Sequence, residues 1–295
     1  MVSSRPDRPR ISFEVFPPKS EMAAQGLWDT VSRLAALGPD FISVTYGAGG
    51  STRERSLAAV LGVRDRTGLD VAGHLTCVGA SKADVIKVAK SYERLGCNRI
   101  VALRGDPPEG HGHFTPHPEG FADTVELIET LAASGSFEIW VGAYPEKHPE
   151  AQSTAHDIDW LKRKIDAGAT GAITQFFFET EKFLHFRDAC AAAGISAPIV
   201  PGILPIVDFD KMTRFAEKCA TTVPDWMWRA FDNAETRQDE RMLSIAIATE
   251  QCDELLSNGV DHLHLYTLNS AELSFAVCTA LGIEPQAPSQ IASCG

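Results

Sequence analysis

The chain has 295 residues, and 44% of them are hydrophobic, which is enough to bury a large core. The formal net charge of −12 provides no basic excess to neutralise phosphates, so we expect no binding to nucleic acid. The N-terminus lacks the apolar segment of a secretory signal, and no apolar run reaches the roughly 18 residues that span a bilayer. The 7 cysteines are scattered singly, as is typical of reduced thiols, so we expect a soluble cytoplasmic protein without a membrane partner.

Eight short apolar segments recur along the chain, most of them about thirty residues apart, which is the length of one βα unit. They are Ile11–Phe16, Phe41–Tyr46, Val71–Cys77, Arg99–Gly105, Ile139–Tyr144, Gly171–Phe177, Pro198–Leu204 and His262–Leu268. Amphipathic patterns, such as Leu57, Val60 and Leu61, predict helices between them. The sequence therefore predicts an α/β fold, a single (β/α)8 TIM barrel over residues 11–283, with flexible ends at residues 1–10 and 284–295.

The strand spacing doubles once, between Leu204 and His262. Helical patterns at Pro224–Phe231 and around Arg237–Ser257 fill the excess, and no linker-like composition separates them from the rest. We therefore expect extra helices between strands seven and eight rather than a second domain. The segment Pro107–Gly120, rich in Pro, Gly and His, follows strand four, and a long loop at the carboxyl end of a barrel strand is a candidate lid.

Polar or ionisable side chains end nearly every predicted strand, where the chemistry of a parallel barrel is placed. They are Glu14, Thr45, His74, Arg104 with Asp106, Tyr144 and Gln175. The two-residue period of strand one puts Glu14 on the face opposite Ile11 and Phe13, so it should point into the barrel mouth. Partial desolvation there should raise the pKa of Glu14, as a general acid requires near neutral pH.

Less specific interpretations also fit these residues. Glu14 could be a buried carboxylate paired with an arginine, and Arg104–Asp106 a turn with a local salt bridge. The histidines of the Pro107–Gly120 loop have no carboxylate partner nearby, and we expect no metal site. No nucleotide-binding glycine fingerprint follows a strand, and Gly47–Gly50 indicates a tight loop that lets a ligand approach the backbone. The residues alone thus predict a barrel enzyme with a carboxylate at its mouth, but no substrate.

Nine sequence blocks, each at a predicted strand end or a neighbouring helix, are more specific. They are Ser12–Pro18, Ser43–Gly50, His74–Cys77, Leu103–Asp106, Ala143–Glu146 with His148, Lys162–Ala169, Ile173–Phe178, Pro201–Pro205 and Tyr266–Asn269. In this order they resemble the methylenetetrahydrofolate reductases, in the short bacterial form without a regulatory domain. The chain has Ser270 where some relatives have an arginine, and Lys211 where some have a folate-contacting glutamine, which bears on substrate or cofactor preference.

The resemblance implies a flavin barrel that binds FAD without a Rossmann motif. The implied FAD contacts are Thr45, His74, Arg104, Gly105, Asp106, Tyr144, His148, Asp157 and Lys164. The implied folate-binding residues are Glu14, Asp106, Gln175, Phe215 and Tyr266. Two of these are implied to be catalytic: Glu14 as the acid that protonates N10 and opens the five-membered ring, and Asp106 as the carboxylate that stabilises the resulting iminium cation.

The implied activity is the reduction of 5,10-methylenetetrahydrofolate to 5-methyltetrahydrofolate by NAD(P)H, through reduced FAD, in two half-reactions at one face of the flavin. The choice between NADH and NADPH and the physiological direction stay open. The expected partners are the folate substrate, NAD(P)H and further copies of the chain in a homo-oligomer. The alternatives are another FAD barrel oxidoreductase, such as a proline dehydrogenase, a flavin-free folate-binding methyltransferase barrel, or a catalytically silent barrel that serves as a binding partner.

Overall fold

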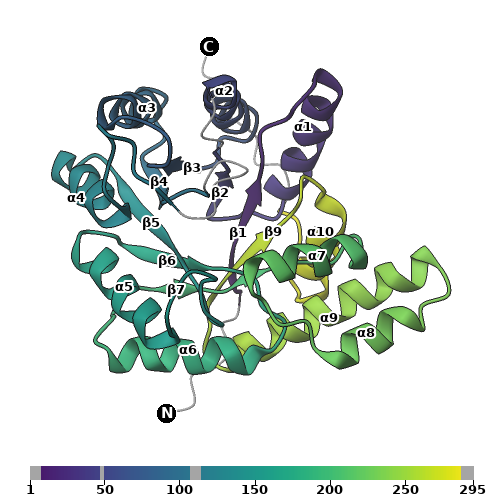
Figure 1. Cartoon of the computed structure of the whole chain (residues 1–295). Helices are drawn as coiled ribbons and strands as arrows, with labels where there is room; N and C mark the ends of the chain where they lie inside the picture. Colours follow the sequence, from purple (N-terminus) through teal and green to yellow (C-terminus); the bar gives the residue numbers. More distant parts are fainter. Residues whose placement is uncertain (1–7, 47–49, 107–113, 287–295) are drawn as a thin grey trace.

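The computed structural model describes residues 8–46, 50–106 and 114–286. Its parallel strands form a ring that the helices surround (Figure 1). The strands are β1 (Arg10–Val15), β2 (Phe41–Val44), β3 (Val71–Thr76), β4 (Arg99–Leu103), β5 (Glu138–Ala143), β6 (Gly171–Thr174), β7 (Ile199–Val200), β8 (Gly202–Ile203) and β9 (His262–Tyr266). Each predicted strand is present within a few residues, so the predicted (β/α)8 barrel is confirmed.

The predicted seventh strand is divided into β7 and β8 at Pro201, which has no N–H to donate to a strand ladder. β7 pairs with β6 on one side, and β8 pairs with β9 on the other. The carbonyl of Pro201 still accepts a hydrogen bond from the backbone N–H of His264 at 3.0 Å. The ring of strands therefore closes through this short interruption.

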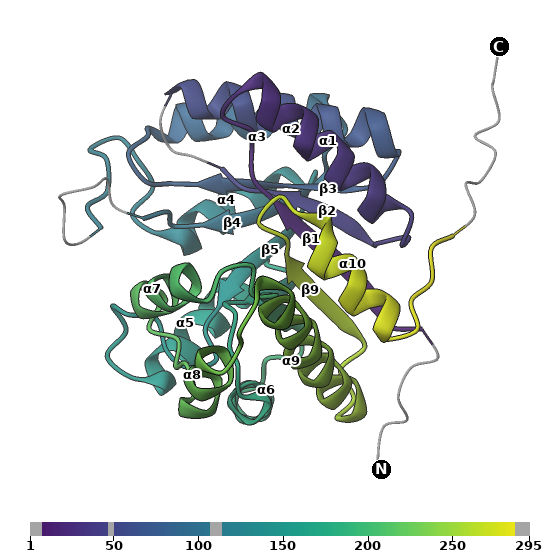
Figure 2. The same cartoon turned by 90° about the vertical axis from the view of Figure 1, so that its right-hand side faces the viewer.

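Helices follow the strands and cover the outside of the barrel. They are α1 (Glu21–Ala35), α2 (Gly50–Thr67), α3 (Lys82–Arg94), α4 (Thr124–Ser134), α5 (Thr154–Asp166), α6 (Thr180–Ala192), α7 (Phe209–Cys219), α8 (Asp225–Asp232), α9 (Arg237–Ser257) and α10 (Ala271–Ala280). The extra helices predicted between strands seven and eight are confirmed as α8 and α9, and α7 precedes them. Figure 2 shows α9 packed beside α10 next to the closing strand β9.

Local sequence explains where several helices begin. The side chains of Ser81, Asp123 and Ser153 each accept a hydrogen bond from a backbone N–H in the first turn of α3, α4 and α5. Thr236 and Asp239 form a reciprocal capping box at the start of α9. These caps satisfy backbone donors that a helix leaves unpaired, and they define where the loops that carry site residues end.

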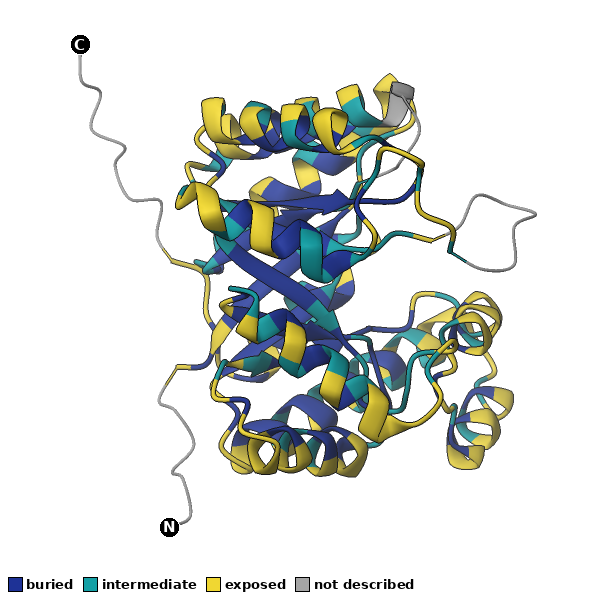
Figure 3. Cartoon of the chain, turned by 60° about the vertical axis from the view of Figure 1, so that its left-hand side comes forward, coloured by how far each residue is buried: buried dark blue, intermediate teal, exposed yellow. Residues whose placement is uncertain are grey.

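Two apolar layers hold the barrel. Ile11, Phe13 and Val15 of β1 face the helices and are buried, as the two-residue period predicts. Inside the ring, a second cluster fills the barrel: Phe41, Ala72, Val101, Trp140, Ile173 and Val200. Figure 3 shows the buried strands in the centre and the exposed outer faces of the helices. This interior cluster closes the barrel below Glu14, so polar side chains above it line a pocket and not a channel.

Several predictions concern residues outside the described part of the chain. They include the ends at residues 1–7 and 287–295, residues 47–49 of the glycine-rich loop, and residues 107–113 of the candidate lid. The backbone N–H of Gln286 donates to the carbonyl of Ala36 at 2.7 Å. Within the described ranges, no helix combines the length and apolar character needed to cross a membrane.

Candidate active site

A pocket of about 420 Å³ opens at the carboxyl ends of the strands. Most residues that the sequence singled out line it: Glu14, Thr45, His74, Arg104, Gly105, Asp106, Tyr144, His148, Gln175, Phe215 and Tyr266. They come from seven strands or the loops that follow them and, in the case of Phe215, from α7. The barrel thus gathers in one place side chains that are up to 252 residues apart in the sequence.

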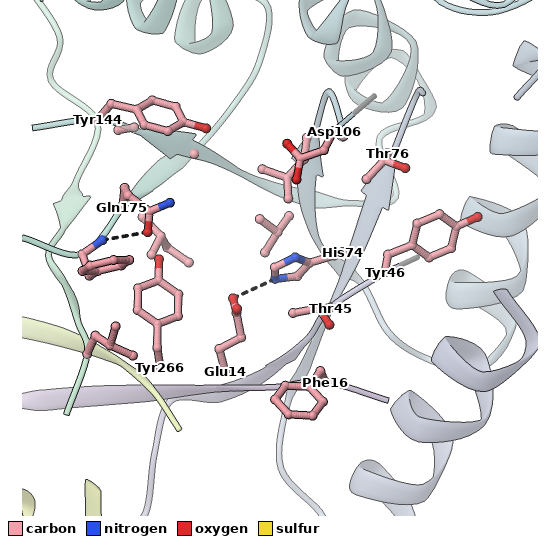
Figure 4. Close-up of a pocket in the computed structure, with 18 of the residues that line it drawn as sticks. Glu14, Phe16, Thr45, Tyr46, His74, Thr76, Asp106, Tyr144, Gln175 and Tyr266 are labelled. Carbon is pink, nitrogen blue, oxygen red and sulfur yellow. Dashed lines mark hydrogen bonds and ion pairs between the residues drawn. The ribbon is translucent and has the colours of Figure 1, made fainter. Parts of the chain in front are cut away.

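Glu14 lies at the end of β1 and points into this pocket (Figure 4). Its Oε2 is 3.2 Å from Nε2 of His74 and 3.8 Å from Nε2 of His264. The hydroxyl of Ser43 lies 3.4 Å from the same oxygen. Glu14 therefore contacts groups from β2, β3 and β9. Its ion-pair partners are two histidines, and not the arginine that the alternative interpretation of the sequence assumed.

The expected rise in the pKa of Glu14 is wrong for this site. Burial raises the pKa, but the combined effect of His74 and His264 is larger and lowers it to about 2. The sequence pattern placed His74 at a strand end but did not pair it with Glu14, and it did not single out His264. The strand period could have indicated His264, because it precedes Tyr266 by two residues and therefore lies on the same face of the strand.

The pocket lining also holds an amide and two aromatic rings. Oε1 of Gln175 accepts a hydrogen bond from the backbone N–H of Phe176 at 3.0 Å, which fixes the orientation of the amide. The ring of Phe215 stacks on Phe176 with centroids 5.4 Å apart and remains 45% exposed. Tyr266 donates its hydroxyl proton to the carbonyl of Thr174 at 2.7 Å. Together these groups offer a hydrogen-bonding edge and a stacking face to a flat heterocycle.

A second pocket of about 310 Å³ adjoins the first and shares Leu103, Arg104, Gly142, Ala143, Tyr144 and His148 with it. Asp157 and Lys164 of α5, the two predicted residues outside the first pocket, line this one. Carboxylate Oδ2 of Asp157 accepts a hydrogen bond from the backbone N–H of His148 at 2.6 Å. Burial raises the pKa of Asp157 and lowers that of His148.

Lys164 is a buried cation in the wall of the second pocket. Its ammonium donates to the carbonyl of Gly142 at 2.5 Å. Burial lowers its pKa from 10.5 to about 8, against an opposing effect of Asp157. Nearby, Arg104 forms an ion pair with Glu150 that sequence reasoning did not anticipate. A buried ammonium without a contacting carboxylate is costly, and an anionic ligand would offset that cost.

Gly105 is a position where the backbone requires glycine. Its φ is +84°, and an added Cβ would clash with the side chain of Val78. The loop between Arg104 and Asp106 can therefore turn sharply at the carboxyl end of β4. As a result, the guanidinium and the carboxylate both reach the pocket from one strand end.

The residues present fit an elongated ligand with an anionic part. The two pockets join along Arg104, Tyr144 and His148, and the buried hydroxyl of Thr76 in the first pocket has no hydrogen-bond partner among the described residues. Fold and site together define a (β/α)8 barrel with an enzyme-like site at the carboxyl ends of its strands.

Comparison with known proteins identifies the family. The family model described as methylenetetrahydrofolate reductase matches residues 3–282. The 5,10-methylenetetrahydrofolate reductase of Escherichia coli (strain K12) is 45% identical over 280 residues, which cover 93% of this chain and 91% of that protein. The chain therefore belongs to the methylenetetrahydrofolate reductase family.

Two further matches show the range of this similarity. Methylenetetrahydrofolate reductase (NADH) 1 of Zea mays is 35% identical over 288 residues, which cover 94% of this chain but 49% of that protein. A solved structure, an uncharacterized protein from Clostridium thermocellum that binds two copies of 5-methyl-5,6,7,8-tetrahydrofolic acid, superposes with a TM-score of 0.62. It covers 94% of this chain and 95% of that one at 15% identity, which supports the fold alone.

Proposed function

We propose that this protein reduces 5,10-methylenetetrahydrofolate to 5-methyltetrahydrofolate with reducing equivalents from NAD(P)H and with FAD as its cofactor. The observation that carries the proposal is the joined pair of pockets: one holds Glu14, Asp106 and Gln175, and the other holds a buried Lys164. The names of the relatives from Escherichia coli and Zea mays support the same reaction.

The second pocket would hold the phosphate and ribose part of FAD. Lys164 and Arg104 supply positive charge for phosphates, and the carboxylate of Asp157 can accept hydrogen bonds from ribose hydroxyls. Thr45, His74 and Tyr144 would contact the part of the cofactor in the first pocket. When bound, FAD supplies hydride transfer between the nicotinamide and the folate. The protein binds and orients both partners.

Gln175 and Phe215 would position the folate. The amide of Gln175, already fixed by the backbone of Phe176, can hydrogen-bond the polar edge of a pterin. The exposed face of Phe215 can stack on a planar ring of folate or nicotinamide. These contacts would place the bridging carbon of the folate near the mouth of the barrel, between Glu14 and Asp106.

Glu14 would donate the proton that opens the five-membered ring at N10. In the ligand-free site Glu14 is ionised, because His74 and His264 lower its pKa. A folate that covers the pocket excludes water, and this desolvation raises the pKa of Glu14 toward that of a working acid. Asp106 remains at the exposed rim, where its negative charge would stabilise the iminium cation on N5.

The test begins with the visible spectrum of the purified protein, followed by anaerobic addition of NADH or NADPH and then of 5,10-methylenetetrahydrofolate. We expect flavin bands that NADH or NADPH bleaches and that the folate restores, with 5-methyltetrahydrofolate as product. A flavoprotein reduced by proline instead would indicate a proline dehydrogenase, and a protein that takes up no FAD would indicate the flavin-free methyltransferase barrel. Cytoplasmic location and self-association remain predictions, the first supported by free thiols at the described cysteines.

A further inference from the structure

A column of buried polar side chains continues from Glu14 into the barrel. His264 and Ser12 are fully buried, and His262 is 3% exposed. Oγ of Ser12 lies 2.7 Å from Nδ1 of His264 and 3.0 Å from Nε2 of His262. The parallel pairing of β1 and β9 sets Ser12 beside His264 and Arg10 beside His262. The column therefore runs from Glu14 through His264 and Ser12 to His262.

The hydroxyl of Ser12 has one proton, so it donates to one imidazole and accepts from the other. This leaves two possible arrangements of the N–H groups. In the first, both imidazoles carry their proton on Nε2, and the N–H of His264 points toward Glu14. In the second, both carry it on Nδ1, and a bare nitrogen of His264 faces the carboxylate. The Glu14 carboxylate at the upper end of the column distinguishes these arrangements.

At the upper end, Oε2 of Glu14 lies 3.8 Å from Nε2 of His264, an ion-pair distance, and this nitrogen has no hydrogen-bond partner among the described residues. A carboxylate accepts hydrogen bonds only, so it favours a proton on that nitrogen. His74 from β3 approaches the same oxygen at 3.2 Å, and Ser43 from β2 lies 3.4 Å away. Tyr266, two residues along β9, packs its ring edge-on against His264 with centroids 5.3 Å apart.

At the lower end, Nδ1 of His262 is buried and has no hydrogen-bond partner within the described ranges. Burial is the main cause that lowers the pKa of His262, and the positive charges of Arg10 and Arg99 add to this effect, although each also pairs with a carboxylate, Asp40 and Glu138 respectively. In the first arrangement this nitrogen is bare, whereas in the second it would be a buried N–H donor without an acceptor. The Glu14 carboxylate at the upper end therefore selects the first arrangement, and the unpartnered Nδ1 at the lower end is compatible with it.

We propose that His264, Ser12 and His262 are positioning residues for Glu14, and that the column holds His264 as the neutral tautomer with its Nε2–H directed at the Glu14 carboxylate. Oε2 then faces His264, His74 and Ser43, and Oε1 is presented to the folate. The catalytic part of this inference rests on the proposed role of Glu14 as the acid, whereas the tautomer itself does not. The column orients Glu14 from below without touching substrate.

Nitrogen-15 NMR of the histidine side chains tests the tautomer in the protein as purified. Histidines labelled with ¹⁵N distinguish Nε2–H, Nδ1–H and the cation by their shifts and couplings, and His264→Gln and His262→Gln assign the two signals by their loss. We expect both residues as neutral Nε2–H tautomers at pH 7, and a changed His264 signal in Ser12→Ala. An Nδ1–H tautomer or a cation at His264 would overturn the proposal, whether or not the protein reduces folate.

The pH profile of folate reduction tests the consequence for Glu14. In Ser12→Ala the ionised form of Glu14 is less stabilised, so its pKa should rise. The limb of the profile on which the rate falls with rising pH should therefore shift to higher pH by roughly half to one pH unit. Reduction of the flavin by NAD(P)H should keep its rate. Ser12→Thr, which retains a hydroxyl, should restore the profile, and Ser274→Ala, a buried serine on α10, should leave it unchanged.

The outcomes separate two failures. If the wild-type protein does not reduce the folate, the proposed function is wrong, and the NMR result alone judges the column. If the wild-type protein reduces the folate and Ser12→Ala keeps the wild-type pH profile, the positioning role is refuted. Loss of folding in Ser12→Ala would leave the wild-type tautomer of His264 as the deciding measurement.

Discussion

Replacing Lys164 by methionine should weaken FAD binding without lowering the stability of the FAD-free protein. Methionine keeps the apolar stem in its buried place on α5 and removes the ammonium. The pKa of Lys164 is lowered from 10.5 to about 8, and at 1.36 kcal/mol for each pKa unit this corresponds to a cost of about 3 kcal/mol for the charged form in the folded state.

The contribution of Lys164 to stability depends on pH, because its pKa differs between the folded and the unfolded state. Below pH 8 the lysine is charged in both states, and the cost is present in full. Between about pH 8 and 10.5 the unfolded chain binds the proton more tightly, so stability rises with pH. Lys164→Met removes the cost at pH 7, but it also leaves the carbonyl of Gly142 without this donor, a loss of about 1–3 kcal/mol. The net change in the free energy of unfolding should lie between about 0 and +2 kcal/mol.

FAD affinity should move in the opposite direction. A charge-assisted hydrogen bond to a phosphate contributes about 1.5–3 kcal/mol, which corresponds to roughly a 10- to 100-fold increase in Kd. Urea unfolding of the FAD-free protein and fluorescence titration with FAD measure the two quantities. Lys162→Met is the matched control, because Lys162 lies on the same helix and pairs with Asp166 at the surface. An unchanged Kd for Lys164→Met, or a loss of stability above about 3 kcal/mol, would refute the reasoning.

Three further predictions follow from single residues. Glu14→Gln should retain FAD and its reduction by NAD(P)H, but its rate of folate reduction should fall by roughly 100-fold or more. Stopped-flow spectroscopy measures each half-reaction separately, and a wild-type rate of folate reduction would remove Glu14 from the acid role. Because the pKa of Glu14 is lowered from 4.5 to about 2, its ionised form stabilises the fold above pH 4.5, and that contribution is lost as the pH falls toward 2. Glu14→Gln should therefore flatten this part of the acid-unfolding curve by at most about 3 kcal/mol, and an unaltered curve would contradict the role of the two histidines. Gly105→Ala should destabilise the protein by about 2 kcal/mol or more in urea unfolding, because it adds a clash with Val78 to the strain of a positive φ. The control Gly135→Ala, at a position with φ +68° and open space around it, should cost only about 1 kcal/mol. Equal losses of stability in the two variants would argue against the clash.

The secondary structure was largely predictable because it depends on short-range patterns. Apolar runs about thirty residues apart are the repeat of a βα unit, and the observed strands begin or end within a few residues of them. Pro201 was part of a predicted strand, and the structure divides the strand there because proline has no N–H for the ladder. The helix α7 was not predicted; it lies between strand seven and the two extra helices that the sequence did predict.

The set of pocket residues was predictable only in part from physics. Strand alternation placed Glu14 inside the barrel mouth, which the structure confirms. The grouping of Asp157 and Lys164 with Arg104 came from the resemblance, because no local pattern reports that a helix residue of α5 reaches a pocket wall. The pairing of Arg104 with Glu150 depends on loop conformation and was not predicted.

The sequence by itself determined the repeat of strands and helices, the inward face of β1 and the family, since each is written in local spacing or in ordered motifs. The tertiary structure decided the electrostatic state of Glu14. Its neighbours His74 and His264 lie 60 and 250 residues away in the chain, and they meet it only because β3 lies near β1 in the ring and β9 closes the ring against β1. Burial alone raises the pKa of a carboxylate, and only the folded barrel supplies the imidazoles that reverse that effect.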